Sequence, residues 1–455
     1  MSDDKAAIPE CSSVRRAITA IWHIEAAKII GRVARIVRDV GLAEEFAQDA
    51  LVSALERWPV DGVPENPGAW LMTAAKRRAL DHLRHEHITA GKAGEFGSEL
   101  DFQHELTHDT LIEQIDARLD AWFDKANAAA IDDDLLRLIF TACHPVLSPE
   151  ARCALTLRVM GGLSTDEIAR AYLKTEATIA QRIVRAKRTL AVARVPFEVP
   201  RGADLVQRLA SVLEVIYLIF NEGYLATSGD DWMRPTLCEE ALRLGRVLAG
   251  LMPEESEVLG LVALMEIQSS RFAARVSPKG DPILLLDQNR ARWDRLLIRR
   301  GLDALARAEA RPVALGPYAL QAAIAACHAR APNAEQTDWA HIAALYDALA
   351  QTAPSPVVTL NRAVAVAMAF GPQAGLEIVD ALRDEPGLQS YHLLPSVRGD
   401  LLVRLDRIGE AGDEFRRAAK LTRNARERDF LLERAMHCDD AGAQRRSDES
   451  NSSTA

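Results

Sequence analysis

The residues best suited to chemistry lie in the stretch LSTDEIARAYLKTEATIAQRIVRAKR, which runs from Leu163 to Arg188. Between positions 174 and 194 the chain carries six basic residues and one acidic residue, although its overall net charge is -10. Such a local excess of cations favours contact with phosphate groups. Gln181 and Arg185 stand early in the second half of the stretch, where a helix could bring them to base edges in the major groove. The stretch therefore predicts DNA binding, and the alternative is a solvated basic face on a helical hairpin.

Two short helices have to position these side chains. Ser164 and Glu167 form the Ser-x-x-Glu pattern of a capping box, which starts the first helix. Leu173 and Lys174 form the turn, and Thr175 is placed to cap the second helix. Apolar residues recur at helical spacing in both helices: Ile168, Ala169, Tyr172, Ile179, Ile183 and Val184. The helix lengths and the short joint fit a helix-turn-helix.

A second basic helix is expected nearer the N-terminus, in the segment NPGAWLMTAAKRRALDHLRHEH. Its basic face consists of Lys76, Arg77, Arg78 and Arg84. Trp70 could stack on an unpaired base, but a tryptophan at helical spacing with apolar neighbours is also typical of a core residue. We expect Asp81 to form a salt bridge with a neighbouring arginine.

The helical pair that precedes this segment, RIVRDVGLAEEFAQDALVSALERWP, has an acidic and amide-rich face. Its members are Asp39, Glu44, Glu45, Gln48 and Asp49. Charge complementarity speeds and orients docking between proteins. This face therefore predicts a protein partner, and a solvated helix face is the alternative.

Composition places the chain among ordinary globular proteins whose nucleic-acid surface is local. It has 455 residues, of which 48% are hydrophobic and 26% are charged. The six cysteines form no CxxC pair, which favours reduced thiols. The acidic N-terminus lacks the apolar core of a signal peptide, and no apolar run is long enough for a membrane span. We expect a cytoplasmic protein.

Abundant Ala, Leu, Arg and Glu, with apolar residues at three- and four-residue intervals, predict an all-α fold. Prolines, glycines and polar stretches divide the chain into a flexible N-terminus (1–14), a first helical domain (15–90), a linker (91–130), a helix-turn-helix domain (131–195), a central helical domain (196–312), a tetratricopeptide-like helical domain (313–440) and a disordered tail (441–455).

The fourth helical part shows weak internal similarity. Gly371 and Gly409 are each expected to mark a turn between two helices, and they lie 38 residues apart. This spacing is close to the tetratricopeptide period of about 34 residues. Small residues such as Ala365 and Ala367 would allow close helix contact. A non-repetitive helical bundle is the alternative.

The segment NEGYLATSGDDW, from Asn221 to Trp232, is the most functional-looking part of the central domain. Gly223 and Gly229 permit sharp backbone turns beside polar residues. The candidate hinge or ligand-binding loop consists of Asn221, Glu222, Gly223 and Tyr224. A capped loop between helices is the alternative.

Nothing in the sequence indicates an enzyme. Cys143, His144 and Cys153 lack a fourth ligand and the spacing of a zinc site, so packing is the better interpretation. The acidic run at 132–134 fits the N-terminus of a helix, where negative charge is favourable. We expect no catalytic residues, no metal and no cofactor.

The order of these motifs resembles that of bacterial extracytoplasmic-function (ECF) sigma factors. Residues 39–59 resemble region 2.1–2.2, which docks on the clamp helices of the polymerase β′ subunit. Residues 66–84 resemble regions 2.3–2.4, which melt and read the minus-ten element, and residues 163–188 resemble region 4.2, which reads the minus-thirty-five element. Later segments, including VIYLIFNEGYLATSGDD, resemble the subgroup with a long C-terminal tetratricopeptide-like extension, which is thought to regulate the factor in cis.

The resemblance implies a role for each candidate residue. DNA contacts are expected from Asn66, Trp70, Lys76, Arg77, Arg84, Thr175, Thr178, Gln181, Arg182, Arg185 and Arg188. Contacts with the polymerase are expected from Asp39, Glu44, Glu45, Gln48 and Asp49. Gln181 and Arg185 would read bases, whereas most other contacts from such a helix hold phosphates and fix the register.

The partners implied are core RNA polymerase, through the β′ clamp helices and the β subunit, and promoter DNA, with no membrane. The C-terminal domain would contact the chain's own sigma domains or an unknown regulator. A competing class is a helix-turn-helix transcriptional activator with a repeat-type sensor domain, which would not bind core polymerase as a sigma factor. A helical scaffold that binds only proteins is a third class, but it leaves the two basic helices unexplained.

Overall fold

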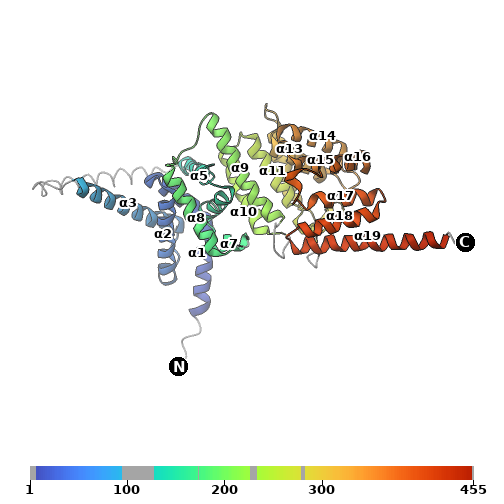
Figure 1. Ribbon diagram of the computed structural model, residues 1–455. Helices are drawn as coiled ribbons and strands as arrows, with labels where there is room; N and C mark the ends of the chain where they lie inside the picture. The colour runs from blue at the N-terminus through green and yellow to red at the C-terminus, as the bar shows by residue number, and fades with distance from the viewer. Residues whose placement is uncertain (1–6, 95–127, 173, 226–232, 278–281, 453–455) are drawn as a thin grey trace, which may run out of the picture. The chain divides into compact units, whose positions relative to one another are not determined.

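The protein is described by a computed structural model that covers residues 7–94, 128–172, 174–225, 233–277 and 282–452 (Figure 1). Within these ranges every regular element is a helix, and the only β-type pairing is an isolated bridge between Val276 and Pro282. The predicted all-α class is therefore confirmed. None of the helices in these ranges combines the length and the apolar character that crossing a membrane requires.

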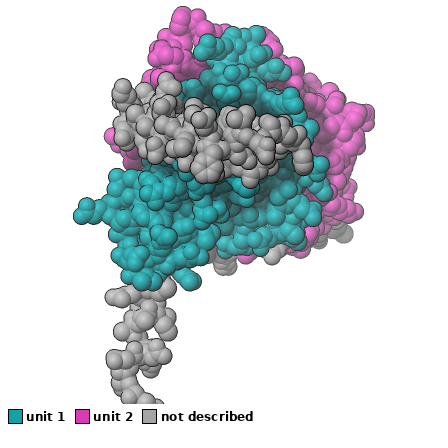
Figure 2. Space-filling model, turned by 90° about the vertical axis from the view of Figure 1, so that its left-hand side faces the viewer, with its two compact units in different colours: residues 1–215 teal, residues 216–455 magenta. Residues whose placement is uncertain are grey.

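The chain folds as two compact units, residues 1–215 and residues 216–455, which Figure 2 colours teal and magenta. The α-helices described in unit 1 are α1 (Ala7–Val37), α2 (Val40–Asp61), α3 (Pro67–Gly94), α5 (Ala128–Ala142), α6 (Pro149–Val159), α7 (Thr165–Ala171) and α8 (Glu176–Val192). Helix α9 (Ala203–Tyr224) begins in unit 1 and ends in unit 2.

Unit 1 extends beyond the predicted boundary at residue 195 and includes the first half of α9, up to residue 215. The first half of α9 is bonded to α5 and its end, since Arg208 donates to the Phe140 carbonyl at 2.7 Å and Ser211 to the Cys143 carbonyl at 2.6 Å. Arg152 of α6 forms an ion pair with Glu214 at 2.9 Å. The prolines between α8 and α9 therefore end a helix but do not end the packed unit.

The α-helices of unit 2 follow α9 in the order α10 (Pro235–Leu251), α11 (Ser256–Ser269), α12 (Arg295–Glu309), α13 (Pro317–Arg330), α14 (Trp339–Thr352), α15 (Pro356–Phe370), α16 (Pro372–Ala381), α17 (Leu393–Arg404), α18 (Ile408–Leu421) and α19 (Ala425–Ser452). Short 3-10 turns occur at Phe272–Ala274, Leu285–Asp287, Arg290–Arg292 and Pro386–Leu388. From α13 to α19 each helix packs against the next, as Figure 1 shows.

The two segments compared as repeats both form helix pairs, but only one uses its glycine as the turn. Gly371 lies between α15 and α16 with φ 102°, as predicted. Gly409 lies inside α18, so its predicted role as a turn is wrong; Asp406, with φ 65°, makes that turn instead. The expected close contact holds for Ala367, because a Cβ added at Gly375 of α16 would meet the Ala367 Cβ at 2.4 Å. The α15–α16 pair is thus joined by small residues.

Three predicted ends differ from the structure. Helix α1 starts at Ala7, inside the segment expected to be flexible, and α19 continues to Ser452, where we expected a disordered tail. The tail is polar, but its Ala, Gln and Arg residues are good helix formers, and it contains no proline that would end a helix already nucleated. Within the expected linker, α3 continues to Gly94 and α5 begins at Ala128, and residues 95–127 lie outside the described residues.

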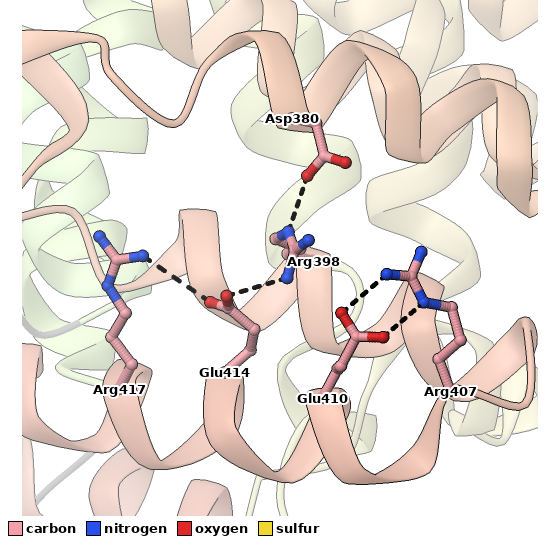
Figure 3. A network of polar contacts seen from close by, with 6 residues as sticks. All are labelled: Asp380, Arg398, Arg407, Glu410, Glu414 and Arg417. Carbon is pink, nitrogen blue, oxygen red and sulfur yellow. Dashed lines mark hydrogen bonds and ion pairs between the residues drawn. The ribbon is translucent and has the colours of Figure 1, made fainter.

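A buried arginine joins three helices of unit 2 (Figure 3). Arg398 of α17 is only 7% exposed and donates to Asp380 of α16 at 2.7 Å and to Glu414 of α18 at 3.0 Å. The exposed Arg407, which directly precedes α18, forms two hydrogen bonds of 2.7 Å with Glu410. This part of unit 2 therefore contains a buried arginine that bridges two carboxylates and an exposed arginine that binds both oxygens of one carboxylate.

This pairing predicts a difference between two arginine variants. Arg398→Met should lower the free energy of unfolding of unit 2 by about 3 kcal/mol, because the buried Glu414 carboxylate keeps only its longer contact with Arg417, at 4.0 Å. Arg407→Met, the matched control, should leave the free energy of unfolding nearly unchanged, because water screens the exposed pair. Urea unfolding followed by circular dichroism measures both values. Equal losses in the two variants would contradict the role given to burial.

Candidate nucleic-acid interface

Local hydrogen bonds start both helices of the predicted helix-turn-helix. The Ser164 hydroxyl accepts from the Glu167 amide at 3.1 Å, and the Glu167 carboxylate accepts from the Ser164 amide at 2.7 Å. The Thr175 hydroxyl accepts from the Thr178 amide at 3.2 Å. The predicted capping box of α7 and cap of α8 are therefore confirmed, while Leu173 in the turn lies outside the described residues.

Helix α8 has one buried and one exposed face. The buried face consists of Ile179, Ile183, Ala186 and Leu190. The exposed residues include Thr175, Thr178, Gln181, Arg185 and Arg188, and Arg182 is half-buried. No carboxylate among the described residues forms an ion pair with Arg185 or Arg188, which are both exposed, while Arg182 lies close enough to Glu150 to lower the pKa of that carboxyl. Val184 is also exposed, although it is apolar.

A shallow cavity of about 360 Å³ brings together four of the predicted DNA-contacting residues. Thr178, Gln181, Arg182 and Arg185 of α8 line one side of it. Ser148, which caps α6 through the Ala151 amide, lines the other side. The arrangement offers a hollow with amide, hydroxyl and guanidinium groups, which are the groups that bind bases and phosphates.

The second predicted DNA surface lies on α3. Asn66 caps this helix, since its side-chain oxygen accepts from the Ala69 amide at 3.1 Å. Arg77 is exposed, whereas Lys76 and Arg84 are half-buried. Arg84 forms an ion pair with Asp81 at 3.2 Å, which confirms the expected salt bridge of Asp81.

Trp70 packs against the core of α2. Its ring lies 5.4 Å from the ring of Trp58 in an edge-to-face arrangement, and Trp58 is 2% exposed. Trp70 itself is half-buried. The contact with Trp58 explains why Trp70 stands at the helical spacing of a core residue. The exposed part of the Trp70 ring is still the candidate surface for stacking on a base.

The predicted acidic surface of α2 is divided between two faces. Asp39 caps the helix, accepting from the Gly41 and Leu42 amides at 2.6 and 3.0 Å. Glu45 is exposed, and Gln48 and Asp49 are half-buried. Glu44 is 4% exposed, so the expectation that it belongs to an accessible acidic face does not hold in this structure.

Glu44 instead joins two groups of helices in unit 1: the first helical group, α1–α3, and the helix-turn-helix group, α5–α8. Its carboxylate accepts from Arg158 of α6 at 2.7 Å and also pairs with Lys187 of α8. A buried carboxylate is stable only when cations and hydrogen bonds compensate its charge. The two groups are therefore held together by one shared anion.

A second buried carboxylate reinforces this contact. Asp134 of α5 is 1% exposed and pairs with Arg32 at 3.1 Å and Arg35 at 3.5 Å, both from α1. Burial raises the pKa of Asp134, and the hydrogen bond from Arg32 opposes that rise. The interpretation of the acidic run at 132–134 as helix N-terminal charge missed this role, because nothing local indicates a partner 102 residues away.

The thiol considered for a metal site has a packing partner. Cys143 Sγ lies 3.3 Å from the Thr156 hydroxyl, and burial raises the pKa of Cys143 to about 12. His144 is only half-buried, yet burial, together with the charge of Arg208, lowers its pKa to about 4. A thiol that stays protonated at neutral pH is a poor metal ligand.

The candidate hinge or ligand-binding loop is mostly helical. Asn221, Glu222, Gly223 and Tyr224 form the last turn of α9, and residues 226–232 lie outside the described residues. Gly223 is not at a sharp turn; a Cβ there would meet the Cys238 amide nitrogen of α10 at 2.7 Å. Its predicted role as a turn is wrong, and its small size instead allows α10 to approach α9.

Three known families match parts of the chain. Residues 25–87 match the family described as Sigma-70 region 2, and residues 137–190 match Sigma-70, region 4. Residues 208–309 match a family of unknown function (DUF6596). The first match falls on α1–α3 and the second on α5–α8, which are the two groups joined by Glu44.

Similar proteins agree with these matches. The chain is 42% identical to an uncharacterized protein of Rhizobium meliloti over 90% of this chain and 92% of that protein. It is 28% identical to the ECF RNA polymerase sigma factor SigK of Mycobacterium ulcerans, over 39% of this chain and 84% of SigK. It is 26% identical to a probable ECF RNA polymerase sigma factor, SigI of Mycobacterium tuberculosis, over 39% of this chain and 56% of SigI.

The shared anion at Glu44 predicts a local effect of its removal. Glu44→Gln should lower the free energy of opening of the α2–α8 contact by about 2 kcal/mol, because two cations lose a charged acceptor. Hydrogen–deuterium exchange of the α2 and α8 amides should become faster in full-length protein. Glu45→Gln, on the neighbouring exposed position, is the control and should leave exchange unchanged. The same exchange in all three proteins would show that Glu44 does not hold the groups together.

Proposed function

Because the chain belongs to the ECF sigma factors of RNA polymerase and carries a helical C-terminal extension, we propose that it binds core polymerase and directs it to specific promoters, under control by the extension in cis. Such a protein acts in the bacterial cytoplasm, where polymerase and promoters meet. The observation that carries the proposal is the open face of α8, where Gln181 and Arg185 stand in a helix-turn-helix that matches Sigma-70, region 4.

The first helical group would dock on the polymerase and hold the opened strand. Glu45, Gln48 and Asp49 remain accessible or partly accessible for the β′ clamp helices. Asp39 and Glu44 would join that interface only after the contacts they make here are rearranged. On α3, the candidates for the minus-ten DNA are Asn66, Trp70, Lys76, Arg77 and Arg84.

Helix α8 would read the minus-thirty-five element. Gln181 and Arg185 are one helical turn apart, so both can enter the same stretch of major groove. Thr175, Thr178, Arg182 and Arg188 surround them and are suited to phosphates, which fix the register of the helix on DNA. Energy for melting would come from captured bases and polymerase contacts, and we expect no nucleotide hydrolysis by this chain.

The contact through Glu44 bears on regulation. The names of the two promoter elements imply about 25 base pairs between them, or roughly 85 Å at 3.4 Å per base pair. In this structure α2 and α8 are in direct contact, and α3 packs on α2. We propose that the α2–α8 contact opens when the protein engages the polymerase, and that the extension changes how readily it opens.

Substitutions on the open face of α8 test DNA readout. Gln181→Ala and Arg185→Ala should each cost about 1–3 kcal/mol of promoter discrimination, because each removes a contact with a base edge. Run-off transcription with core polymerase and a pool of promoter fragments measures this. Arg188→Ala is the comparison and should weaken all promoters alike, with a smaller dependence on salt. Unchanged promoter choice would remove Gln181 and Arg185 from the readout.

Removal of the extension tests both the sigma activity and control in cis. We expect promoter-specific transcripts from full-length protein and from residues 1–215, at different levels. A shorter form ending near residue 200 would lose the α9 hydrogen bonds to α5, so it is not equivalent. If neither protein bound core polymerase while full-length protein still bound DNA, the activator class would replace the sigma assignment. Equal transcript levels would exclude control by the extension.

A further inference from the structure

A cavity of about 590 Å³ lies within unit 2, among α9, α11, α13, α14 and α15. Its volume is within the range of small-molecule sites in proteins. Rings of Tyr217, Phe220 and Tyr346 form part of its wall, and the side chains of Asn221 and Asn361 lie at it as well. Asn221 and Tyr224 of the predicted ligand-binding segment line this cavity, although their backbone is helical.

A buried cation stands at the wall without an acidic partner. Arg271 is 7% exposed and donates to the Tyr224 hydroxyl at 2.6 Å. No carboxylate of the described residues forms an ion pair with Arg271, and its Nε has no hydrogen-bond partner among them. By contrast, the acid nearest in sequence to Tyr224, Glu222, is already paired with Arg234. A buried guanidinium without a counter-ion is costly, so an anion bound in the cavity would stabilise the unit.

The surroundings of Arg271 are positive and aromatic. The guanidinium of Arg275 lies 3.5 Å from the centre of the Tyr224 ring, and that of Arg271 lies 5.8 Å from it. His328, which also lines the cavity, is 8% exposed, and burial together with Arg271 and Arg290 lowers its pKa to about 4. It is therefore neutral at pH 7, where it cannot add a second full charge beside Arg271.

Several polar groups at the wall lack a hydrogen-bond partner among the described residues. Tyr346 forms no hydrogen bond with the described residues, and the Gln268 side-chain oxygen and His328 Nδ1 also have no partner there. The Tyr217 hydroxyl is oriented by Gln321 at 3.0 Å. Buried polar groups normally have partners, so this set indicates a molecule that offers both hydrogen-bond donors and acceptors.

We propose that the extension binds a small organic carboxylate in this cavity, with its carboxylate toward Arg271 and a planar, hydroxyl-bearing body between the tyrosines. A carboxylate is favoured over a phosphate because the site offers one unpaired guanidinium within largely aromatic walls. A second negative charge would be desolvated there, because the nearby Arg275 already donates to the Tyr224 carbonyl and does not line the cavity. The proposal concerns binding alone and does not depend on the role in transcription.

Isothermal titration of full-length protein with 4-hydroxybenzoate tests the proposal. We expect saturable binding with a dissociation constant of about 1 mM or tighter. Benzamide has a similar shape without the charge and should bind about tenfold more weakly, because it lacks the ion pair with Arg271. Inorganic phosphate should neither bind at this strength nor displace 4-hydroxybenzoate.

Variants locate the binding. Arg271→Gln should weaken 4-hydroxybenzoate about tenfold and abolish its preference over benzamide, because the cation is gone. Tyr346→Phe keeps the ring and the charge, so it should weaken binding by a smaller factor even if Arg271→Gln folds poorly. Arg330→Gln, at an exposed arginine at the end of α13, is the control and should bind normally. Absence of binding, equal binding of phosphate, or binding unchanged in both Arg271→Gln and Tyr346→Phe would overturn the proposal.

Discussion

The arrangement of unit 1 depends on one buried carboxylate. Glu44 is only 4% exposed, and the two cations that pair with it come from α6 and α8. The position of the helix-turn-helix is thereby tied to α2, which carries the candidate polymerase residues. Because Lys187 turns toward Glu44, Gln181 and Arg185 on other sides of α8 are left facing solvent. The same helix can therefore hold the contact and present a surface for DNA.

Buried charges in the chain are of two kinds. Asp134 and Arg398 are buried and form ion pairs; Asp134 joins helices that are distant in sequence, and Arg398 joins three consecutive helices. Arg271 is buried to the same degree but lacks an acidic partner among the described residues. The first kind of charge is compensated by carboxylates of the chain, whereas the second has only a hydroxyl and aromatic rings beside it among the described residues. This difference is the physical reason for placing a ligand in the extension.

What could be predicted from the sequence was local. Capping at Ser164 and Thr175 and the salt bridge of Asp81 involve partners three residues apart, so spacing alone specifies them. The contacts of Glu44 with Arg158 and Lys187 span 114 and 143 residues, and no local pattern encodes them. Gly409 was misplaced for a related reason: either Asp406 or a glycine can adopt a left-handed turn, and the packing of α17 on α18 decides which does.

The proposed opening of unit 1 has an energetic limit. To move an equilibrium from 1:99 to 99:1, a partner must favour the open state by about 5.5 kcal/mol. The ion pairs at Glu44 and Asp134 set the scale of what must be overcome, since each is worth no more than a few kcal/mol once desolvation is counted. Docking of α2 on the polymerase would compete directly for Glu44, so binding energy would be converted into release of α8. Glu44, which holds α2 and α8 together, is thus also the group through which the polymerase would separate them.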